Sequence, residues 1–285
     1  MKYYSDVASE LISNTFKRCE KELEYGCKSV LINIDNQQKQ KFYDKPFGEY
    51  YTLECDNLFY LSQVVTDYMA DCLALYIQNK LQKLTKKQDN KVLVACLGNG
   101  KIVCDSLGEK VFNKVIASNQ SFTSNSLCAI NPSVYGKTNI KSVDYIEAIV
   151  HKIKPDVCVV VDALCSHSIT RIGSCVQVCD SGIFAGGAVN RGVDAVISKK
   201  SLGIPTLCIG VPLVVRVESI INDFIQTLSS EDMGDEENLY FHYKNVIVAP
   251  KNIDFLVNQS ADLIAMSINK AILGLTKQEQ EMLRV

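Results

Sequence analysis

The chain has 285 residues, of which 47% are hydrophobic and 22% are charged, so it can bury a large core in one or two domains. Its formal net charge of −2 gives no electrostatic case for binding nucleic acid or a membrane surface. No run reaches the ~20 apolar residues that a membrane span requires, and the first residues do not resemble a signal peptide, so we expect a cytoplasmic protein.

The first third of the chain mixes helical and strand patterns. Residues 8–24 repeat apolar side chains at helical spacing, whereas 28–35 and 49–55 have the pattern of strands. The polar stretch between these strands, 36–50, predicts a loop or a hairpin. A long helical pattern then covers residues 57–84.

From residue 91 onward, strand-like runs alternate with helical stretches. The runs are KVLVACL, SLCAI, DVCVVVD, SCVQVCD and TLCIGVP, and the helical stretches lie near 105–117, 142–153 and 213–228. Apolar runs without alternation are typical of strands buried on both faces. The predicted fold is therefore α/β, with a mixed, mostly parallel sheet flanked by helices on both faces.

The end of the chain predicts an exposed stretch and a helix. Residues 229–245 are acidic and lack periodicity, so we expect an exposed excursion. A closing helix is expected from about Asn252, whose side chain suits an N-cap. We find no internal repeat, and we favour a single domain over 1–285 in which 1–85 pack on the sheet.

The twelve cysteines lie singly in apolar runs, and no Cys-x-x-Cys pair occurs. Thiols placed in this way would mispair in an oxidising compartment, so we interpret them as reduced core residues. Cys175 and Cys179, the nearest pair, face the same side of a strand and should pack there. Because zinc-ligand spacings are absent, we expect neither a metal nor a cofactor.

Two aspartates follow apolar runs. Asp162 ends the run PDVCVVVD, and Asp105 follows KVLVACLGNGKIVC. Ligands bind beyond the carboxyl ends of parallel strands, so both side chains are expected at the same rim of the sheet. Two adjacent carboxylates do not both ionise easily, and such a pair can act as acid and base on a water. The alternative is that each aspartate is the N-cap of a following helix or turn.

Other polar residues near these positions have competing interpretations. The stretch LGNGK (97–101) lacks a P-loop or G-x-G-x-x-G pattern, which favours a tight turn over a phosphate site. The glycine-rich stretch 182–192, which contains Gly186, suits the binding of a peptide backbone but also an ordinary connection. A lone loop histidine such as His167 is more often solvated than functional. Ser166 has no base-and-orienter arrangement, so a serine nucleophile is not supported.

Five segments resemble, in the same order, the germination proteases of spore-forming bacteria, which degrade small acid-soluble spore proteins. They are CLGNGKIVCDSLGEKV (96–111), NPSVYGKTNI (131–140), KPDVCVVVDALCSHSITRI (154–172), VQVCDSGIFAGGAV (176–189) and SLGIPTLCIGVPLVV (201–215). Residues 50–55 and 251–272 also resemble that family, so the resemblance covers most of the chain.

The resemblance implies a specific activity and assembly. It implies that Asp105 and Asp162 are catalytic, that the fold is similar to that of hydrogenase-maturation peptidases, and that the protein is a homotetramer. It also implies a zymogen with a short N-terminal propeptide that self-cleavage removes. SDVASE (5–10) is similar to the processing site, with the cut between Asp6 and Val7. The spore-protein substrates carry a similar motif, so propeptide and substrate are expected to compete for one groove.

The sequence departs from the family pattern at several positions. Phe184-Ala185 stands where the family usually has His-Pro, Tyr135-Gly136 replaces Met-Gly, and 229–245 replace a longer insertion. The segment that precedes Asp6 is also short. These differences indicate a divergent member.

We therefore expect an endopeptidase of the spore core in which Asp105 and Asp162 share a proton across a water. Asn99 and the amides of 98–100, Gly100 included, are expected to stabilise the oxyanion. Asp180 is expected near the same rim as support or substrate contact. Further supporting positions are Ser166, His167 and Gly186. Two alternatives remain open: a metal-dependent maturation-type peptidase, and a catalytically silent binding member.

Overall fold

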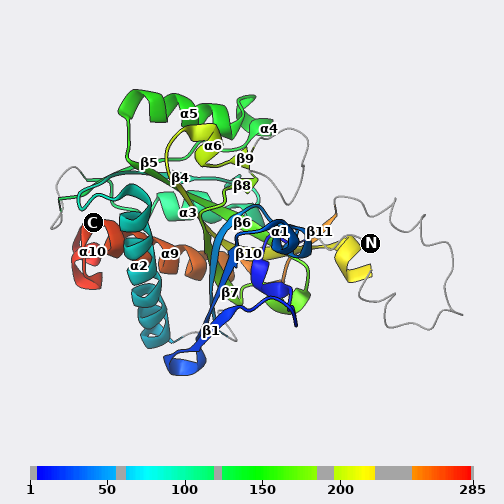
Figure 1. The fold of residues 1–285 in the computed structure, drawn as a ribbon. Coiled ribbons are helices and arrows are strands. Elements are labelled where there is room, and N and C mark those ends of the chain that lie inside the picture. Colours follow the sequence, from blue (N-terminus) through cyan, green and yellow to red (C-terminus); the bar gives the residue numbers. More distant parts are fainter. Residues whose placement is uncertain (1–4, 56–61, 119–123, 185–195, 222–245, 284–285) are drawn as a thin grey trace, which may run out of the picture.

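The computed structural model describes residues 5–55, 62–118, 124–184, 196–221 and 246–283 (Figure 1). The strands are β1 (Cys19–Glu22), β2 (Lys28–Ile34), β3 (Gly48–Glu54), β4 (Lys91–Cys96), β5 (Ser126–Ile130), β6 (Val157–Ser166), β7 (Cys175–Cys179), β8 (Ile183–Phe184), β9 (Val196–Ile197), β10 (Thr206–Arg216) and β11 (Ile247–Val248). The α-helices are α1 (Gln37–Tyr43), α2 (Gln63–Thr85), α3 (Leu107–Phe112), α4 (Tyr135–Thr138), α5 (Ser142–Ile153), α6 (Lys199–Leu202), α9 (Ile253–Leu273) and α10 (Lys277–Leu283). The 3₁₀ helices are η1 (Ala8–Glu10), η2 (Glu24–Gly26), η4 (Val103–Asp105) and η5 (Ile169–Arg171).

The described strands form one large sheet in the order β1-β2-β3-β7-β10-β6-β4-β5, with β11 beside β10. Strands β10, β6, β4 and β5 are parallel to one another. Strands β7, β3, β2 and β1 each pair antiparallel with their neighbours. The predicted mixed α/β sheet is confirmed, and its parallel part comes from the segments that follow residue 91.

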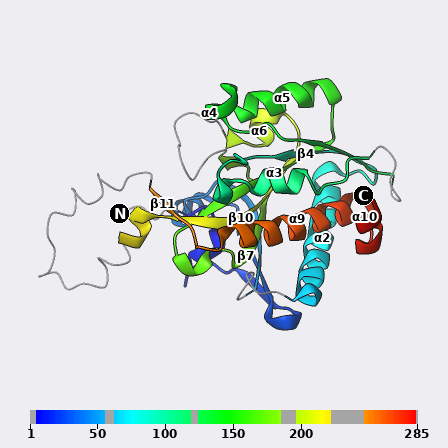
Figure 2. The ribbon, with the colours of Figure 1, turned by 180° about the vertical axis from the view of Figure 1, so that it is seen from behind.

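Helices cover both faces of the sheet, as predicted (Figures 1 and 2). On one face α2, α3 and α9 pack on the odd-numbered residues of β6 and β10, such as Val159 and Ile209. On the other face α1, α5 and α6 pack on the even-numbered residues of the same two strands, such as Val160 and Cys208. Because successive strand residues point to opposite faces, this double cover accounts for apolar runs without alternation.

Several predicted elements are confirmed. Strands β2 and β3 and helix α5 match their predicted ranges, and α2 covers the long helical pattern from Gln63 onward. The closing helix α9 follows Asn252, but that side chain makes no capping hydrogen bond. The helix expected over 105–117 is limited to α3. Residues 229–245 and Gly186 lie outside the described residues. No helix in the described part of the chain has the length and apolarity to cross a membrane.

Three predicted elements are wrong. Residues 8–24 form η1 and β1 rather than a helix, because contacts with distant strands fix residues 5–10 and β1 pairs with β2. The polar stretch 36–50 contains α1, which starts where Asn36 Oδ1 accepts a hydrogen bond from the N–H of Lys39. Strand β10 continues to Arg216, since it stays paired with β6, and the helix begins only at residue 217, with 217–221 the last residues described there.

Candidate active site

The carboxyl group of Asp105 lies against the turn that follows β4. Its Oδ2 accepts a hydrogen bond of 2.9 Å from the N–H of Asn99. Gly98 makes this approach possible, because its φ is +117° and a Cβ there would lie 2.1 Å from the carbonyl oxygen of Asp105. The N-cap position of α3 is Ser106, so Asp105 does not cap that helix.

Burial changes the acidity of this group. Desolvation raises the pKa of Asp105 to about 6, and the hydrogen bond from Asn99 opposes the rise only in part. The N–H of Asn99 was expected to stabilise an oxyanion. In the structure it donates to the Asp105 carboxylate instead.

Asp162 lies inside β6 rather than at its end. Strand β6 pairs with β10 as far as Ser166, so the prediction of a strand end or an N-cap at Asp162 is wrong. The residue is 4% exposed, and its Oδ1 accepts the N–H of Ala163 at 2.9 Å. The N–H of Leu97 donates to Val161 O at 2.8 Å, so the turn that holds Asp105 begins beside Asp162. The structure thus brings both aspartates to the carboxyl end of β4.

Asp162 belongs to a row of residues that crosses the sheet. Gly210 of β10 pairs with Asp162 on one side and with Gln177 of β7 on the other. We call these three residues the Gly210 row. Neighbours in register point to the same face, so the side chains of Asp162 and Gln177 project from the face covered by α5 and α6.

Residues 5–10, which we call the N-terminal segment, lie against this face. The N–H of Asp6 donates to Cys165 O at 2.7 Å, and the N–H of Cys165 donates to Asp6 Oδ2 at 2.8 Å. Val7 is 1% exposed and packs on Leu164, Cys175 and Ile183. The segment is therefore bound along the end of β6.

The second half of the N-terminal segment makes polar contacts. Ser9 Oγ donates to Glu54 Oε1 at 2.8 Å, and Arg171 Nη2 donates to the same carboxylate oxygen at 2.6 Å. The carboxylate of Glu10 accepts the N–H groups of His167 at 2.9 Å and Ser168 at 3.1 Å. These contacts recognise a hydroxyl and a carboxylate at fixed positions after Val7.

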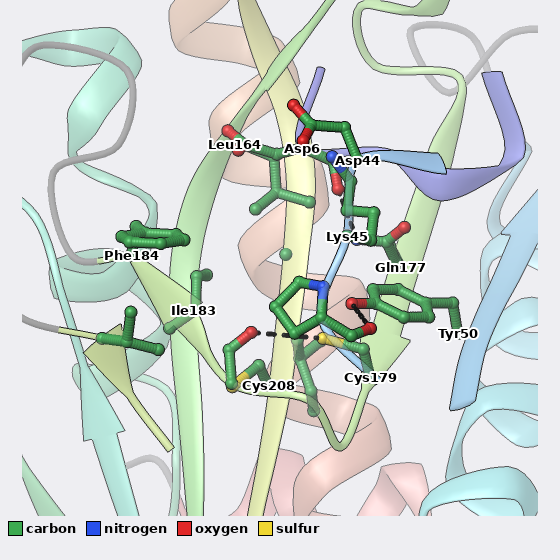
Figure 3. A pocket seen from close by; sticks show the side chains of 15 residues that line it. Asp6, Asp44, Lys45, Tyr50, Leu164, Gln177, Cys179, Ile183, Phe184 and Cys208 are labelled. Atoms are coloured by element: carbon green, nitrogen blue, oxygen red, sulfur yellow. Dashed lines mark hydrogen bonds between the residues drawn. The ribbon is translucent and has the colours of Figure 1, made fainter. Parts of the chain in front are cut away.

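A cavity of about 70 Å³ opens beside this segment (Figure 3). Asp6, Leu164 and Gln177 lie at one end of it, and Cys179 and Cys208 at the other. Gly210 also lines it, so the cavity reaches the Gly210 row.

The structure does not gather all the expected supporting residues here. Asp180 is not at the rim of Asp162, because β7 is antiparallel to β10 and carries Asp180 toward the other end of the sheet. Its carboxylate accepts the N–H of Glu49 and pairs with Lys80. Ser166 is fully buried and donates to Val214 O, and His167 is buried rather than solvated. Gly100 leaves room for the carboxylate of Glu109.

The prediction that the cysteines are core residues is confirmed for most of them. Eight of the twelve are buried, three are half-buried, and Cys19 is exposed. Cys175 and Cys179 lie in the core on the same strand. Among the described residues no group of three or more His, Cys, Asp or Glu side chains is arranged to hold a metal ion.

Gln177 was not predicted as a site residue. It is 4% exposed in the middle of β7, and its carboxamide contacts the N-terminal segment on both sides of Val7. The sequence feature that points to Gln177 is a single amide side chain inside the apolar strand VQVC. A buried polar group of this kind needs hydrogen-bond partners. The sequence does not identify those partners, because they lie 169 and 171 positions away.

Comparison with known proteins identifies relatives along most of the chain. A family model described as germination protease matches residues 9–239. A germination protease of Caldanaerobacter subterraneus subsp. tengcongensis is 29% identical over 92% of this chain and 90% of that protein. One of Clostridium tetani is 30% identical over 88% of this chain and 87% of that protein.

Among solved structures, a [NiFe] hydrogenase maturation protease HycI from Thermococcus kodakarensis KOD1 matches with a TM-score of 0.37 and 17% identity. It covers 68% of this chain and 99% of its own. The match of the family model to most of the sequence, together with the two germination proteases, shows that the chain belongs to the germination protease family and is a peptidase.

Proposed function

We propose that this peptidase degrades small acid-soluble spore proteins during germination and is made as a self-processing zymogen. The observation that carries the proposal is the bound N-terminal segment, which has the substrate-like pattern SDVASE and is hydrogen-bonded to β6, β7 and β3. A chain that binds this pattern in itself has a surface that suits the same pattern in a substrate.

In the proposed mechanism Asp105 and Asp162 share a proton across a water. Asp105 suits the protonated role, because burial raises its pKa to about 6 and so keeps a proton on it closer to neutral pH. The other carboxylate takes a proton from the water as the water attacks the peptide carbonyl. No nucleophilic side chain is needed for this reaction.

The proposal of a zymogen rests on the N-terminal segment, which occupies the groove proposed to bind substrate. Val7 and Ala8 are each 1% exposed, so a substrate reaches the same contacts only after the N-terminal segment has left. Cleavage between Asp6 and Val7 separates Asp6, which is bound to Cys165 and Gln177, from Ala8 and Ser9, which are bound to Gln177 and Glu54. The products are then free to dissociate independently.

The cellular setting and assembly are part of the same proposal. The enzyme acts on protein substrates in the cytoplasm of the spore core and works as a homotetramer. Sedimentation of the purified chain, with and without residues 1–6, measures the assembly directly.

The test is to incubate the purified chain with a small acid-soluble spore protein and to measure its N-terminal mass. We expect cutting and loss of residues 1–6 for the wild type, and a loss of about 10²–10⁴ in rate for Asp105→Asn and Asp162→Asn. The matched control is Asp144→Asn, an exposed aspartate on α5. Undiminished rates in the two site variants would contradict the proposal.

Two outcomes identify the alternatives. Activity that disappears with strong chelators and returns with a divalent ion would favour a metal-dependent peptidase. Binding of the spore protein by the wild type without cutting would favour a silent binding member of the family.

A further inference from the structure

We propose that Gln177 positions the peptide bond that is cut and donates a hydrogen bond to the carbonyl oxygen on which negative charge develops. This inference rests on the proposed function and extends it to a residue outside the aspartate pair. The scissile bond in question is the one between Asp6 and Val7 in the zymogen, and the equivalent bond in a substrate.

The carboxamide of Gln177 brackets Val7. Its Nε2 donates to the carbonyl oxygen of Asp6 at 2.9 Å, and its Oε1 accepts the N–H of Ala8 at 2.8 Å. These two bonds fix the main chain on both sides of one residue in an extended form. Because they involve only main-chain atoms of the peptide, they suit any sequence that lies in the same place.

Through the Gly210 row, Gln177 lies opposite Asp162, with β10 between them. Neighbouring strands are about 4.8 Å apart, so the main chains of β6 and β7 are separated by roughly 10 Å, with β10 between them. Gly210 lets the side chain of Leu164 pack closely over β10, since a Cβ there would lie 2.6 Å from Leu164 Cγ. A peptide carbonyl held by Gln177 Nε2 therefore lies on the same face of the sheet as Asp162, and we place the attacking water between them.

The donor lies where a peptide hydrolase requires it. When the water oxygen bonds to the carbonyl carbon of Asp6, the electron pair of the C=O bond moves to the oxygen that faces Gln177 Nε2. A carboxylate of the pair takes one proton from the water, and the protonated partner returns one to the nitrogen of Val7 as the C–N bond breaks. One water is consumed, and a preorganised donor to that oxygen lowers the barrier.

A competing donor near Asp105 is already engaged. The N–H of Asn99 donates to the Asp105 carboxylate, which keeps it away from a peptide oxygen. Gln177 Nε2 is the described side-chain donor to the Asp6 carbonyl. Its burial at 4% exposure holds the carboxamide in one orientation without competition from water.

The deciding variant is Gln177→Glu in the full chain. Ionised glutamate keeps an acceptor for the N–H of Ala8 but loses the donor to the Asp6 carbonyl. We measure the first-order rate of self-processing by mass between pH 5 and pH 8. Hydrogen exchange of residues 5–10 reports in parallel whether the N-terminal segment stays bound.

We expect the self-processing rate at pH 8 to fall about 10²–10³-fold, with the amide of Ala8 still protected. The deficit relative to wild type should shrink as the pH falls, because a protonated glutamic acid again donates. Gln177→Met, which has neither donor nor acceptor, should be slow at every pH. The control is Gln280→Glu, which changes another buried glutamine, bonded to Met266 O and Leu275 O far from the segment.

Unchanged processing in either Gln177 variant would overturn the inference. So would a loss in Gln177→Glu that is independent of pH and accompanied by exchange of the Ala8 amide, because that result assigns Gln177 a structural role only. If Gln177→Met does not fold, the pH dependence of Gln177→Glu decides alone. A wild type that neither processes itself nor cuts a spore protein is a separate result, which overturns the proposed function.

Discussion

Lys80 and Asp180 form an ion pair that joins helix α2 to the end of β7, with 2.8 Å between Nζ and Oδ2. Lys80 is 6% exposed and also contacts Glu49 Oε1 at 2.8 Å. Burial alone would lower the pKa of Lys80, but the hydrogen bonds to Asp180 and Glu49 raise it above its ordinary value. The ammonium group therefore stays charged at neutral pH, and Asp180 has a structural partner rather than a substrate.

We expect Asp180→Asn to lower stability and not the activity of the folded enzyme. Loss of a largely buried charge-assisted bond costs about 1–3 kcal/mol, which lowers the melting temperature by roughly 2–10 °C. Thermal unfolding and the rate per folded molecule measure the two effects. The control is Asp71→Asn, which breaks a surface pair with Lys270 and should change little. A large loss of rate with unchanged stability would assign Asp180 to the site instead.

For Asp105 we expect the opposite result: substitution should raise stability and lower activity. Its pKa is raised from 3.8 to about 6 by burial, so the ionised form is penalised in the folded state. That penalty is absent below the ordinary pKa of 3.8 and complete above pH 6, where it reaches about 3 kcal/mol. Asp105→Asn removes it while keeping an acceptor for the N–H of Asn99.

The variant Asp105→Asn should therefore be more stable than wild type at pH 8, by up to about 3 kcal/mol, and equally stable at pH 3.5. The free energy of unfolding in urea at both pH values measures the difference. The exposed control Asp144→Asn should show no such pH dependence. Equal stability of Asp105→Asn and wild type at pH 8 would mean that the carboxylate is not strained by burial.

The sequence predicts the fold well where burial dominates. Strands such as β4 and β6 are continuous apolar runs because helices cover both faces, and this pattern does not depend on a distant partner. The prediction of a helix over residues 8–24 fails for the converse reason. Its apolar spacing fits a helix, but Asp6 and Ala8 bond to Cys165 and Gln177, and these tertiary contacts override local preference.

The residues of the candidate site are likewise predictable from the sequence only in part. Asp105 and Asp162 are recognisable because each follows an apolar run, and the structure brings both to the turn after β4. Asp180 also follows an apolar run, but the sequence does not reveal that its strand is antiparallel to β10. Gln177 acquires its role only from the register of β7 with β10, which a single sequence does not specify.

The contacts of Glu10 predict a preference for a carboxylate four residues after the cut. The main-chain N–H groups of His167 and Ser168 donate to this carboxylate at 2.9 and 3.1 Å. Hydrogen bonds to a charged group contribute about 1.5–3 kcal/mol, so a peptide with SDVASQ should have a kcat/KM about 10–100-fold below one with SDVASE.

Fluorescence-quenched peptides added to the processed enzyme measure this ratio. A third peptide, with a serine replaced by alanine upstream of the motif, controls for nonspecific effects of sequence. Equal kcat/KM for the glutamate and glutamine peptides would mean that substrates do not occupy the position of Glu10.

Gly210 provides the last prediction, because it separates Asp162 from Gln177 in the row that crosses the sheet. A Cβ at this position would lie 2.6 Å from Leu164 Cγ and 2.8 Å from the carbonyl oxygen of Asp162. The second contact is with main chain, so β6 and β10 must shift to accommodate it. We expect Gly210→Ala to cost about 1–3 kcal/mol of stability.

The same substitution should slow self-processing by more than about 10-fold in the folded fraction, since displacement of catalytic groups by a fraction of an ångström to 1 Å has large effects on rate. Urea unfolding and the N-terminal mass measure stability and processing in one preparation. Gly136→Ala is the matched control, because a Cβ at Gly136 meets nothing within 4 Å. If Gly210→Ala matched wild type in both measurements, the alignment of Asp162 with Gln177 across β10 would have no part in the reaction.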